Sequence, residues 1–291
     1  MSSVKQPEGM NAPRSITVRE LSVAQQPFAA GETKYWCDGS VSVSEYFHTY
    51  SVLFPEGENF FVRSVMAYAR DPRVLSQPQL KHDVKGFVSQ EVHHASTHIH
   101  YNKMIASRYG HDMEGISSFV KSLLSLPERY RTFSDKKTNC LAITCSLEHL
   151  TATLGELLLN SASGHYLLQR MTPSHRALWI YHAIEEMEHK AVAFDVYEAT
   201  DGRYLRRVWQ HILSTALFIV VSTAVYLLFM WDAGHLFNVF THLHLLNSLF
   251  IHPGFFREAI PMWSEYFQLS FHPWQKGSAR FIRPWDDLLK K

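Results

Sequence analysis

HAIEEMEHK, residues 182–190, gathers two histidines and three glutamates into nine positions of what otherwise reads as a helix. His182, Glu186 and His189 are spaced i, i+4 and i+7, so a helix places all three on one face. Ionisable side chains are costly to bury unless they are paired or bind a metal. The stretch therefore predicts a helix whose polar face meets partners from elsewhere in the chain.

The same spacing recurs in QEVHHASTHIHYNK, residues 90–103. Glu91 and His94 stand at i and i+3, as do Glu186 and His189 of the first stretch. His98 follows one turn later. A single Glu-x-x-His on a helix is usually a solvated face. Two such pairs in apolar surroundings, on separate helices, indicate a shared site instead.

Two other apolar segments each offer a lone glutamate. Glu58 lies in PEGENFF, residues 55–61, and Glu148 lies in SLEHLTATLGELLL, residues 146–159. Glu156 competes with Glu148, but Glu148 is nearer the middle of its predicted helix. The structural alternative for Glu58 is a carboxylate that interacts with the dipole at a helix start.

The spacing of apolar residues predicts helices and no alternating strand, so the expected class is all-α. A polar, Pro- and Gly-containing lead-in precedes four substantial helices, and a hydrophobic helical region with an aromatic tail follows them. The expected helices cover about 55–71, 77–107, 135–163 and 172–200. The expected divisions are a lead-in at 1–54, a four-helix bundle at 55–205 and an extension at 206–291.

One Glu from each of two helices, plus Glu-x-x-His from each of the other two, is the ligand pattern of ferritin-like di-metal carboxylate proteins. Four carboxylates offset the charge of two divalent ions, whereas without cations they repel each other or take up protons. Mixed carboxylate and imidazole ligands suit iron or manganese better than zinc. We therefore expect two iron ions, with manganese or a mixed Fe/Mn pair as alternatives, and O₂ as co-substrate.

Four blocks resemble those of a bacterial family described as predicted metal-dependent hydrolases, over roughly residues 35–210. They are FPEGENFFVRSV, FVSQEVHHASTHIHYN, LEHLTA and YHAIEEMEHKAVAFDVY. The motifs QE-x-x-H-x-x-x-H-x-x-x-N and H-x-x-EE-x-EHK-x-x-x-x-D carry most of the resemblance. The family's description implies hydrolysis by a metal centre that activates water.

The chain is also similar to ferritin-like arylamine N-oxygenases. Their last helix carries an extra histidine four positions before the glutamate of Glu-x-x-His, and His182 stands at that position here. This resemblance implies N-oxygenation of an amine as an alternative activity. The ligands it implies are Glu58, Glu91, His94, Glu148, His182, Glu186 and His189.

Three further residues are candidates for catalytic support around the ligands. Glu185, Asp195 and His98 are placed to orient ligating imidazoles by hydrogen bonds. Asp195 has a surface or capping role as its alternative, and His98 has the alternatives of an eighth ligand or a proton donor.

LSTALFIVVSTAVYLLFMW, residues 213–231, contains no charge, and its length is about what a bilayer core requires. A second apolar run follows at 236–251, and arginines flank the pair of runs, which fits a hairpin entering from the cytoplasmic side. The alternative is a fully buried helix. Either arrangement favours an apolar substrate, such as a lipid or fatty-acyl chain, and residues 213–256 are the expected membrane contact.

Composition narrows the partners and the compartment. A net charge of +1 disfavours nucleic-acid binding. Three cysteines without CxxC, and a polar N-terminus, favour a reducing cytoplasm, with attachment to the inner face of the membrane as an option. The expected activity is a di-iron oxygenase that hydroxylates or desaturates an apolar substrate, served by an electron donor such as a ferredoxin or reductase. A metal-dependent hydrolase, a non-catalytic metal-storage bundle and a homodimeric assembly remain open.

Overall fold

The computed structural model describes residues 16–19, 33–126, 135–275, 282 and 285. Most of these residues lie in α-helices, and an isolated β-bridge joins Cys37 to Met171. The all-α class predicted from the sequence is confirmed. Of the predicted lead-in, residues 1–15 and 20–32 lie outside the described part of the chain.

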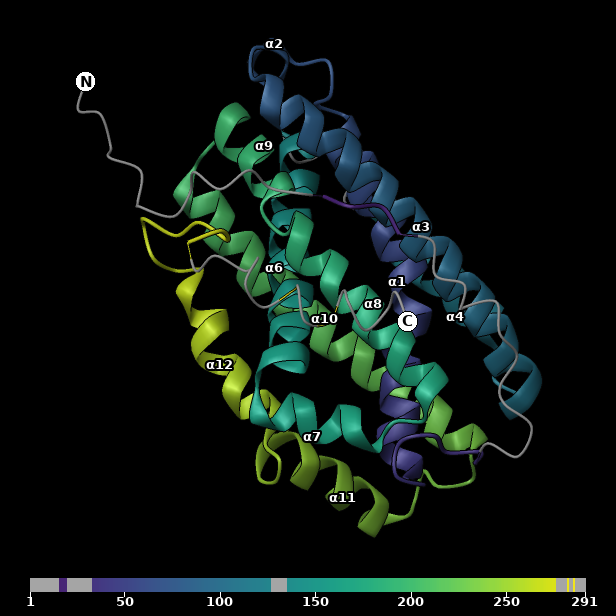
Figure 1. The fold of residues 1–291 in the computed structure, drawn as a ribbon. Helices are drawn as coiled ribbons and strands as arrows, with labels where there is room; N and C mark the ends of the chain where they lie inside the picture. Colours follow the sequence, from purple (N-terminus) through teal and green to yellow (C-terminus); the bar gives the residue numbers. More distant parts are fainter. Residues whose placement is uncertain (1–15, 20–32, 127–134, 276–281, 283–284, 286–291) are drawn as a thin grey trace.

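Four helices form the bundle. They are α1 (Val41–Met66), α3 (Pro78–Tyr109), α6 (Lys136–Asn160) and α8 (Pro173–His189). In the view of Figure 1, α6 and α8 lie in the middle and α3 lies along one side. Helices α1 and α8 each pack against both α3 and α6, which closes the four into a bundle. The other described helices are α2 (Pro72–Leu75), α4 (Met113–Leu124), α7 (Ala162–Arg170), α9 (Val192–Thr200), α10 (Tyr204–Asp232), α11 (Val239–Phe250) and α12 (Phe255–Glu265).

The first bundle helix begins much earlier than the sequence suggested. We expected it to start at Pro55, but α1 begins at Val41 and Pro55 lies inside it, so the boundary between lead-in and bundle at 54 is wrong. This segment contains many serine and threonine residues, whose hydroxyl groups had suggested an irregular lead-in, but several are buried and hydrogen-bonded. Thr49 Oγ1 donates to the backbone oxygen of Glu45 within the helix, and Ser51 contacts α3. Burial of one face of this segment outweighs the preference of proline for a helix start.

The helix that carries Glu148 ends sooner than expected. We expected it to stop at Gly164, but α6 ends at Asn160 and Gly164 lies within α7. A Cβ atom at Gly164 would lie only 2.1 Å from the backbone oxygen of Leu157. This glycine therefore allows α7 to pack closely against the end of α6, rather than ending a helix.

The last predicted bundle helix, 172–200, is divided into two. Helix α8 ends at His189 and α9 begins at Val192. The expected termination after residue 200 is present, because Gly202 adopts a φ of 65°. The break comes directly after the HAIEEMEHK stretch, so the clustered histidines and glutamates all belong to α8.

The hydrophobic extension packs on the bundle by one side only. Helix α10 contacts α1 and α6, yet Trp209, Val220 and Trp231 on its other side are 63%, 64% and 61% exposed. The fully buried alternative is therefore wrong. Among the described helices, α10 is the one long and apolar enough to cross a membrane by length and composition, and 28% of its most apolar window is buried.

Candidate metal centre

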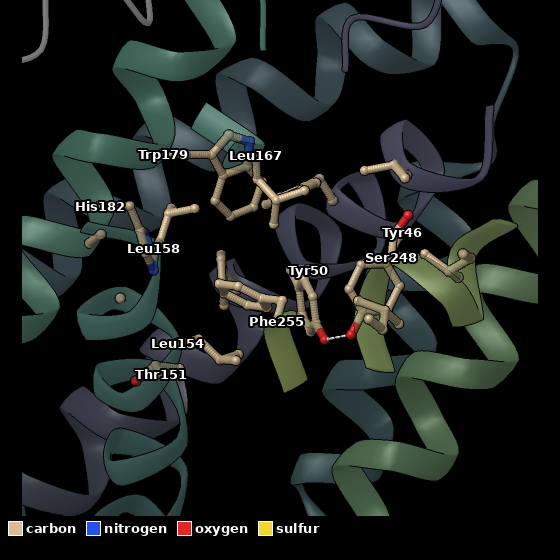
Figure 2. Close-up of a pocket in the computed structure, with 17 residues that line it drawn as sticks. Tyr46, Tyr50, Thr151, Leu154, Leu158, Leu167, Trp179, His182, Ser248 and Phe255 are labelled. Atoms are coloured by element: carbon tan, nitrogen blue, oxygen red, sulfur yellow. Dashed lines mark hydrogen bonds between the residues drawn. The ribbon is translucent and has the colours of Figure 1, made fainter. Parts of the chain in front are cut away.

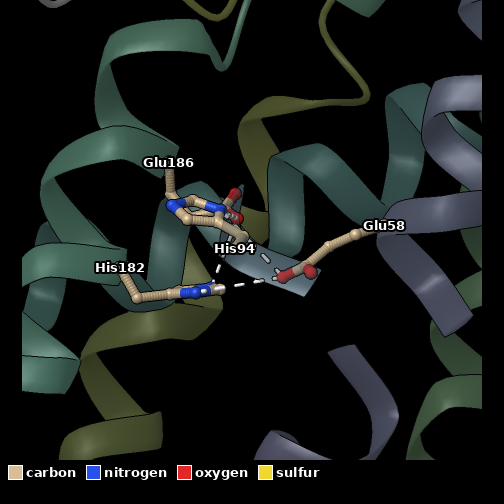
Figure 3. Close-up of side chains that lie close together, drawn as sticks. All are labelled: Glu58, His94, His182 and Glu186. Atoms are coloured by element: carbon tan, nitrogen blue, oxygen red, sulfur yellow. Dashed lines mark ion pairs between the residues drawn. The ribbon is translucent and has the colours of Figure 1, made fainter. Parts of the chain in front are cut away.

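Three of the bundle helices direct four side chains toward one point inside the bundle (Figure 3). Glu58 comes from α1, His94 from α3, and His182 and Glu186 from α8. One ligand atom of each lies within 4.8 Å of the others, and all four residues are buried. Glu186 Oε1 is 3.3 Å from His182 Nε2 and 3.7 Å from His94 Nδ1.

A second group lies beside the first and contains Glu91, Glu148 and His189. His189 Nε2 is 3.0 Å from Glu91 Oε1 and 3.5 Å from Glu148 Oε2. The same nitrogen is 3.6 Å from Glu186 Oε2, so the two oxygens of Glu186 face the two groups. The structure thus brings all seven predicted ligands together. The competing glutamate, Glu156, lies 3.4 Å from Lys190 instead.

The donor atoms of these seven residues fit a pair of cations. Many of them are buried without a hydrogen-bond partner, and each such atom costs about 1–3 kcal/mol unless something else satisfies it. These unpartnered atoms are both carboxylate oxygens of Glu58, Glu91 and Glu148, Nδ1 of His94, Nε2 of His182 and Nε2 of His189. Four carboxylates would balance two divalent ions, and cations would satisfy the unpartnered oxygens and nitrogens.

The pKa values of several of these residues also show that their charged forms are unfavourable where they are buried. Burial raises the pKa of Glu58 well above its ordinary value, and the carboxylates of Glu91 and Glu186 raise it further. Burial also raises the pKa of Glu148 well above its ordinary value. Burial lowers the pKa of His94 to about 4. Glu58 and Glu148 therefore favour the neutral form here unless positive charge is supplied. Glu186 differs, because hydrogen bonds with His182 and His189 outweigh burial and lower its pKa well below the ordinary value.

A hydrogen-bonded chain orients His189 from behind. Its Nδ1 lies 2.9 Å from Gln90 Oε1, and Gln90 Nε2 donates to Glu188 Oε2 at 2.9 Å. Glu188 in turn accepts from the guanidinium of Arg19 at 2.7 Å. Such contacts fix the ring orientation and tautomer of a ligating histidine, leaving His189 Nε2 free to face the centre.

Glu185 is one of the three predicted supporting residues, and it lies against His94. Its Oε2 is 3.0 Å from His94 Nε2, while its Oε1 accepts from the backbone N–H of Arg19 at 3.1 Å. Burial raises the pKa of Glu185 to about 7, although Arg19 opposes that rise. The geometry agrees with an orienting role for Glu185.

His98, the second predicted supporting residue, lies next to a ligand candidate. Its Nε2 is 3.1 Å from His182 Nδ1, and its Nδ1 is 2.8 Å from the hydroxyl of Ser51. Ser51 also donates to Asn102 Oδ1 at 2.7 Å. His98 therefore contacts His182 through Nδ1, which lies 3.9 Å from Glu58 Oε1, while His182 Nε2 faces Glu186, and the contact agrees with an orienting role for His98.

Asp195, the third predicted supporting residue, lies on α9 beyond the break. Its Oδ1 accepts from His272 Nε2 at 2.7 Å, and its side chain is 22% exposed. This contact corresponds to the surface alternative, and Gln90 occupies the position behind a ligating imidazole that we expected for Asp195. The division of the predicted helix at His189 explains the error.

Three supporting residues were not anticipated from the sequence. Thr151 Oγ1 donates to Glu186 Oε2 at 2.6 Å, and Gln90 and Arg19 form the chain behind His189. Gln90 had a signal, because it directly precedes Glu91 within the recurring motif. Arg19 had none, since it lies in a polar segment without helical periodicity.

Two apolar cavities adjoin the centre. The first, here called the inner pocket, measures about 60 Å³ and is bounded by His182, Thr151 and Phe54 (Figure 2). The second, here called the α10 pocket, measures about 340 Å³ and reaches Glu58 and Glu186. Phe54 and Thr151 line both cavities, and the ring of Phe54 stacks on His182 at 4.3 Å.

The fold and the site together define a helical-bundle protein with a buried carboxylate–histidine centre suited to metal ions. Comparison with known families places it more closely. The chain belongs to the family described as predicted metal-dependent hydrolase, whose model matches residues 18–277. That match includes the segment of Arg19 and the hydrophobic extension. No curated protein and no solved structure matches the chain.

Proposed function

We propose that this protein is a di-iron enzyme that hydroxylates or desaturates an apolar substrate with O₂, using electrons from an external donor. The observation that carries the proposal is the contact between the α10 pocket and the centre. A mainly apolar cavity of about 340 Å³ reaches two ligand candidates, Glu58 and Glu186. Two irons bound there would supply reductive O₂ activation, in which hydroxylation puts one oxygen into a C–H bond and two electrons and two protons convert the other to water.

The chain's own residues would hold and orient the ligands. Glu186 faces both ligand groups, and Thr151 donates to it, which limits its rotation. Gln90 and Glu185 hold the outward nitrogens of His189 and His94. Rigid ligands of this kind set coordination geometry and leave positions for other ligands.

Aromatic and hydrogen-bonding residues on the His182 side would exclude water. Phe54 stacks on His182 and separates the α10 pocket from the inner pocket. His98 would hold the other edge of the His182 imidazole. His98 is itself held by Ser51, which donates to Asn102, so a buried chain of hydrogen bonds leads away from His182. A substrate carbon in the α10 pocket would therefore lie in a dry environment beside the glutamates.

Hydrolysis is the second candidate, because the family description supports it. A dinuclear centre can activate water for attack on an ester or phosphoester. The described residues that line the α10 pocket include no lysine, arginine or histidine to hold a charged phosphoester or a developing oxyanion. We favour oxidation for that reason.

Oxygen consumption separates the two candidates. The protein, loaded with Fe²⁺, is supplied with a reductant and dodecanoate, and both O₂ uptake and oxidised product are measured. Oxidation predicts uptake that requires iron and reductant and is lost in Glu91→Ala. Turnover of an ester without O₂ or reductant, together with no O₂ uptake, would instead establish the hydrolase.

A further inference from the structure

The α10 pocket is continuous from the protein surface to the metal centre. Its outer wall contains Trp209, Leu213 and Leu217 of α10, which are 63%, 50% and 43% exposed. Its inner end is bounded by Glu58 and Glu186, which are 2% and 1% exposed. A ligand that enters between the α10 side chains therefore reaches the glutamates without crossing the bundle backbone.

The walls of this pocket select the chemistry of the ligand. Its described lining is mostly aliphatic and aromatic, and its only charged members are the two glutamates at the inner end. The uncharged polar members are Asn139, Thr151, Gln210 and Ser214. The volume of about 340 Å³ is within the range of small-molecule sites, which is about 300–1,000 Å³. A ligand that fills it must be apolar along most of its length, because burying an unpaired polar group is unfavourable.

The inner end leaves space beside the glutamates. Gly57 lines the pocket, and a Cβ atom built on it meets no other atom within 4 Å. The inner pocket lies on the other side of Phe54 and Thr151, which line both cavities. The mostly apolar walls that lead to this space suit an alkyl chain.

The outer end opens on a surface that is suited to lipid. Exposed side chains of α10 between Trp209 and Trp231 are all uncharged, and nearly all are apolar. Those two tryptophans are separated by roughly 33 Å of helix, close to the thickness of a bilayer hydrocarbon core. Tryptophans are enriched where protein meets the membrane–water interface. A second apolar pocket of about 630 Å³ between α10, α11 and α12 lies on the same helix.

We propose that the α10 pocket binds the alkyl chain of a lipid or fatty acid, taken tail-first from a membrane surface against which α10 lies. The inference rests on the proposed function for the reaction, but not for binding. The tail passes between Leu213 and Leu217 and ends beside Gly57, next to Glu58 and Glu186.

Filling the inner end tests the pocket. Calorimetric titration with monomeric dodecanoate compares the protein with Gly57→Phe and Gly57→Ala. The phenyl ring occupies the space beside Glu58, so we expect at least tenfold weaker binding in Gly57→Phe. The matched Ala variant adds one methyl group in open space and keeps its affinity within about twofold. Equal affinity in the wild type and Gly57→Phe, or no binding by the wild type, would overturn the proposal.

A charge at the entrance gives a second test that leaves the core unchanged. Leu213→Glu places a carboxylate at the mouth, while Leu228→Glu is the matched control, because Leu228 is 53% exposed on α10 but lines neither large pocket. We expect only Leu213→Glu to weaken dodecanoate binding, by at least tenfold. Equal weakening by both variants, or by neither, would contradict entry at this point.

Vesicles distinguish the membrane from free ligand as the source. In flotation with phosphatidylcholine–phosphatidylglycerol vesicles, we expect the protein to float and both glutamate variants to float less. Flotation that neither variant reduces, or none at all, would show that the chain comes from solution and would overturn the membrane part. The metal content of each variant is measured in parallel. Absence of dodecanoate binding by the wild type at normal metal content rejects the pocket, whereas normal binding without O₂ uptake rejects the proposed function.

Discussion

Two buried clusters of glutamate and histidine each include residues of α1. They differ in how many of their polar atoms have hydrogen-bond partners. The seven-residue metal centre has many atoms without partners. The second, here called the Glu45 cluster, contains Glu45, His48 and His111. Glu45 Oε2 lies 3.0 Å from His48 Nδ1 and 2.9 Å from His111 Nε2, and His111 Nδ1 lies 3.1 Å from Asp232 Oδ2.

The Glu45 cluster has its ring nitrogens paired. The indole N–H of Trp36 donates to His48 Nε2 at 2.8 Å. His48 therefore carries its proton on Nδ1, which it directs at Glu45, and that nitrogen is not available to bind a metal. The comparison shows that composition alone does not identify a metal centre. The number of unpartnered donor atoms distinguishes the two: among the side-chain atoms of Glu45, His48 and His111, Glu45 Oε1 alone lacks a hydrogen-bond partner.

The largest expected effect is a loss of bound metal in variants of the metal centre, with no loss in a variant of the Glu45 cluster. Glu91→Ala and His189→Ala should lose most of the bound metal, from about two ions per chain, because each removes a ligand of the second group. Glu58→Ala should also reduce loading. Elemental analysis of the purified proteins measures this.

The control for metal content comes from the other cluster. His48→Gln should keep the metal content of the wild type, because His48 already has partners on both nitrogens. Equal loading of wild type and Glu58→Ala would mean that the first-helix ligand is misassigned. Metal loss in His48→Gln at unchanged secondary structure would break the distinction between the clusters.

The second effect concerns the free energy of unfolding, which should fall when Glu45 is replaced by glutamine and should not fall when Glu148 is replaced. Burial alone would raise the pKa of Glu45, but hydrogen bonds from His111 and His48 outweigh it and lower the pKa to about 2. Glu45→Gln breaks a buried ion pair and should destabilise the fold by about 3–5 kcal/mol. Glu148→Gln, in chelator-treated protein, removes a repelling carboxyl and should leave the fold equally stable or more stable.

Urea denaturation of both glutamine variants, in the presence of chelator, measures these free energies of unfolding. A loss of several kcal/mol in Glu148→Gln under chelation would show that its carboxylate is already satisfied by the protein. That result would remove the reason for assigning it to a cation.

The third effect tests whether the N-terminal segment supports the centre. Arg19→Ala removes the guanidinium from Glu188 and leaves Gln90 less firmly held, so metal affinity should fall about 10–100-fold. Competition with a chromogenic chelator measures the affinity. Arg73→Ala is the matched control, because Arg73 pairs with Asp71 away from the centre. Equal affinities in the two variants would reject the role of Arg19.

The smallest effect concerns pH. Burial alone would lower the pKa of His111, but hydrogen bonds with Glu45 and Asp232 raise it above its ordinary value. A raised folded pKa gives stability that is complete below about pH 6.5 and is lost as pH rises through the folded value. Asp232→Asn should therefore cost up to about 1 kcal/mol near pH 6 and less near pH 9.

Thermal or urea unfolding across this pH range measures the difference. Asp201→Asn serves as the control, since Asp201 pairs with Arg206, which keeps its charge throughout. A constant difference for Asp232→Asn from pH 6 to pH 9 would show that His111 does not titrate in this way.

Helical spacing predicted the all-α class and the paired Glu-x-x-His motifs, and the ligand pattern of ferritin-like di-metal proteins with the N-oxygenase resemblance supplied the rest of the seven residues. A period of 3.6 residues places Glu186 and His189 on one face wherever the helix ends, so an error in boundary does not affect them. The start of α1 was missed because its buried hydroxyl groups resemble a loop until their partners across the fold are known. Buried Ser51 illustrates this, since its partners His98 and Asn102 come from α3.

Contacts between distant segments could not be predicted from the sequence. Arg19 reaches Glu188 across most of the chain, and no local spacing indicates such a pair. The Glu45 cluster was missed for the same reason, because Glu45, His111 and Asp232 lie on three separate segments. The sequence also did not predict which side of α10 is exposed, because this depends on which face of the helix packs on the bundle.

The central claim is that two cations lie between the two ligand groups. An anomalous difference map at the iron edge, from crystals of the iron-loaded protein, tests it most directly. The account predicts two peaks, one among Glu58, His94, His182 and Glu186, and one among Glu91, Glu148 and His189, with Glu186 between them. No peak among these seven residues, or a peak in the Glu45 cluster instead, would contradict it.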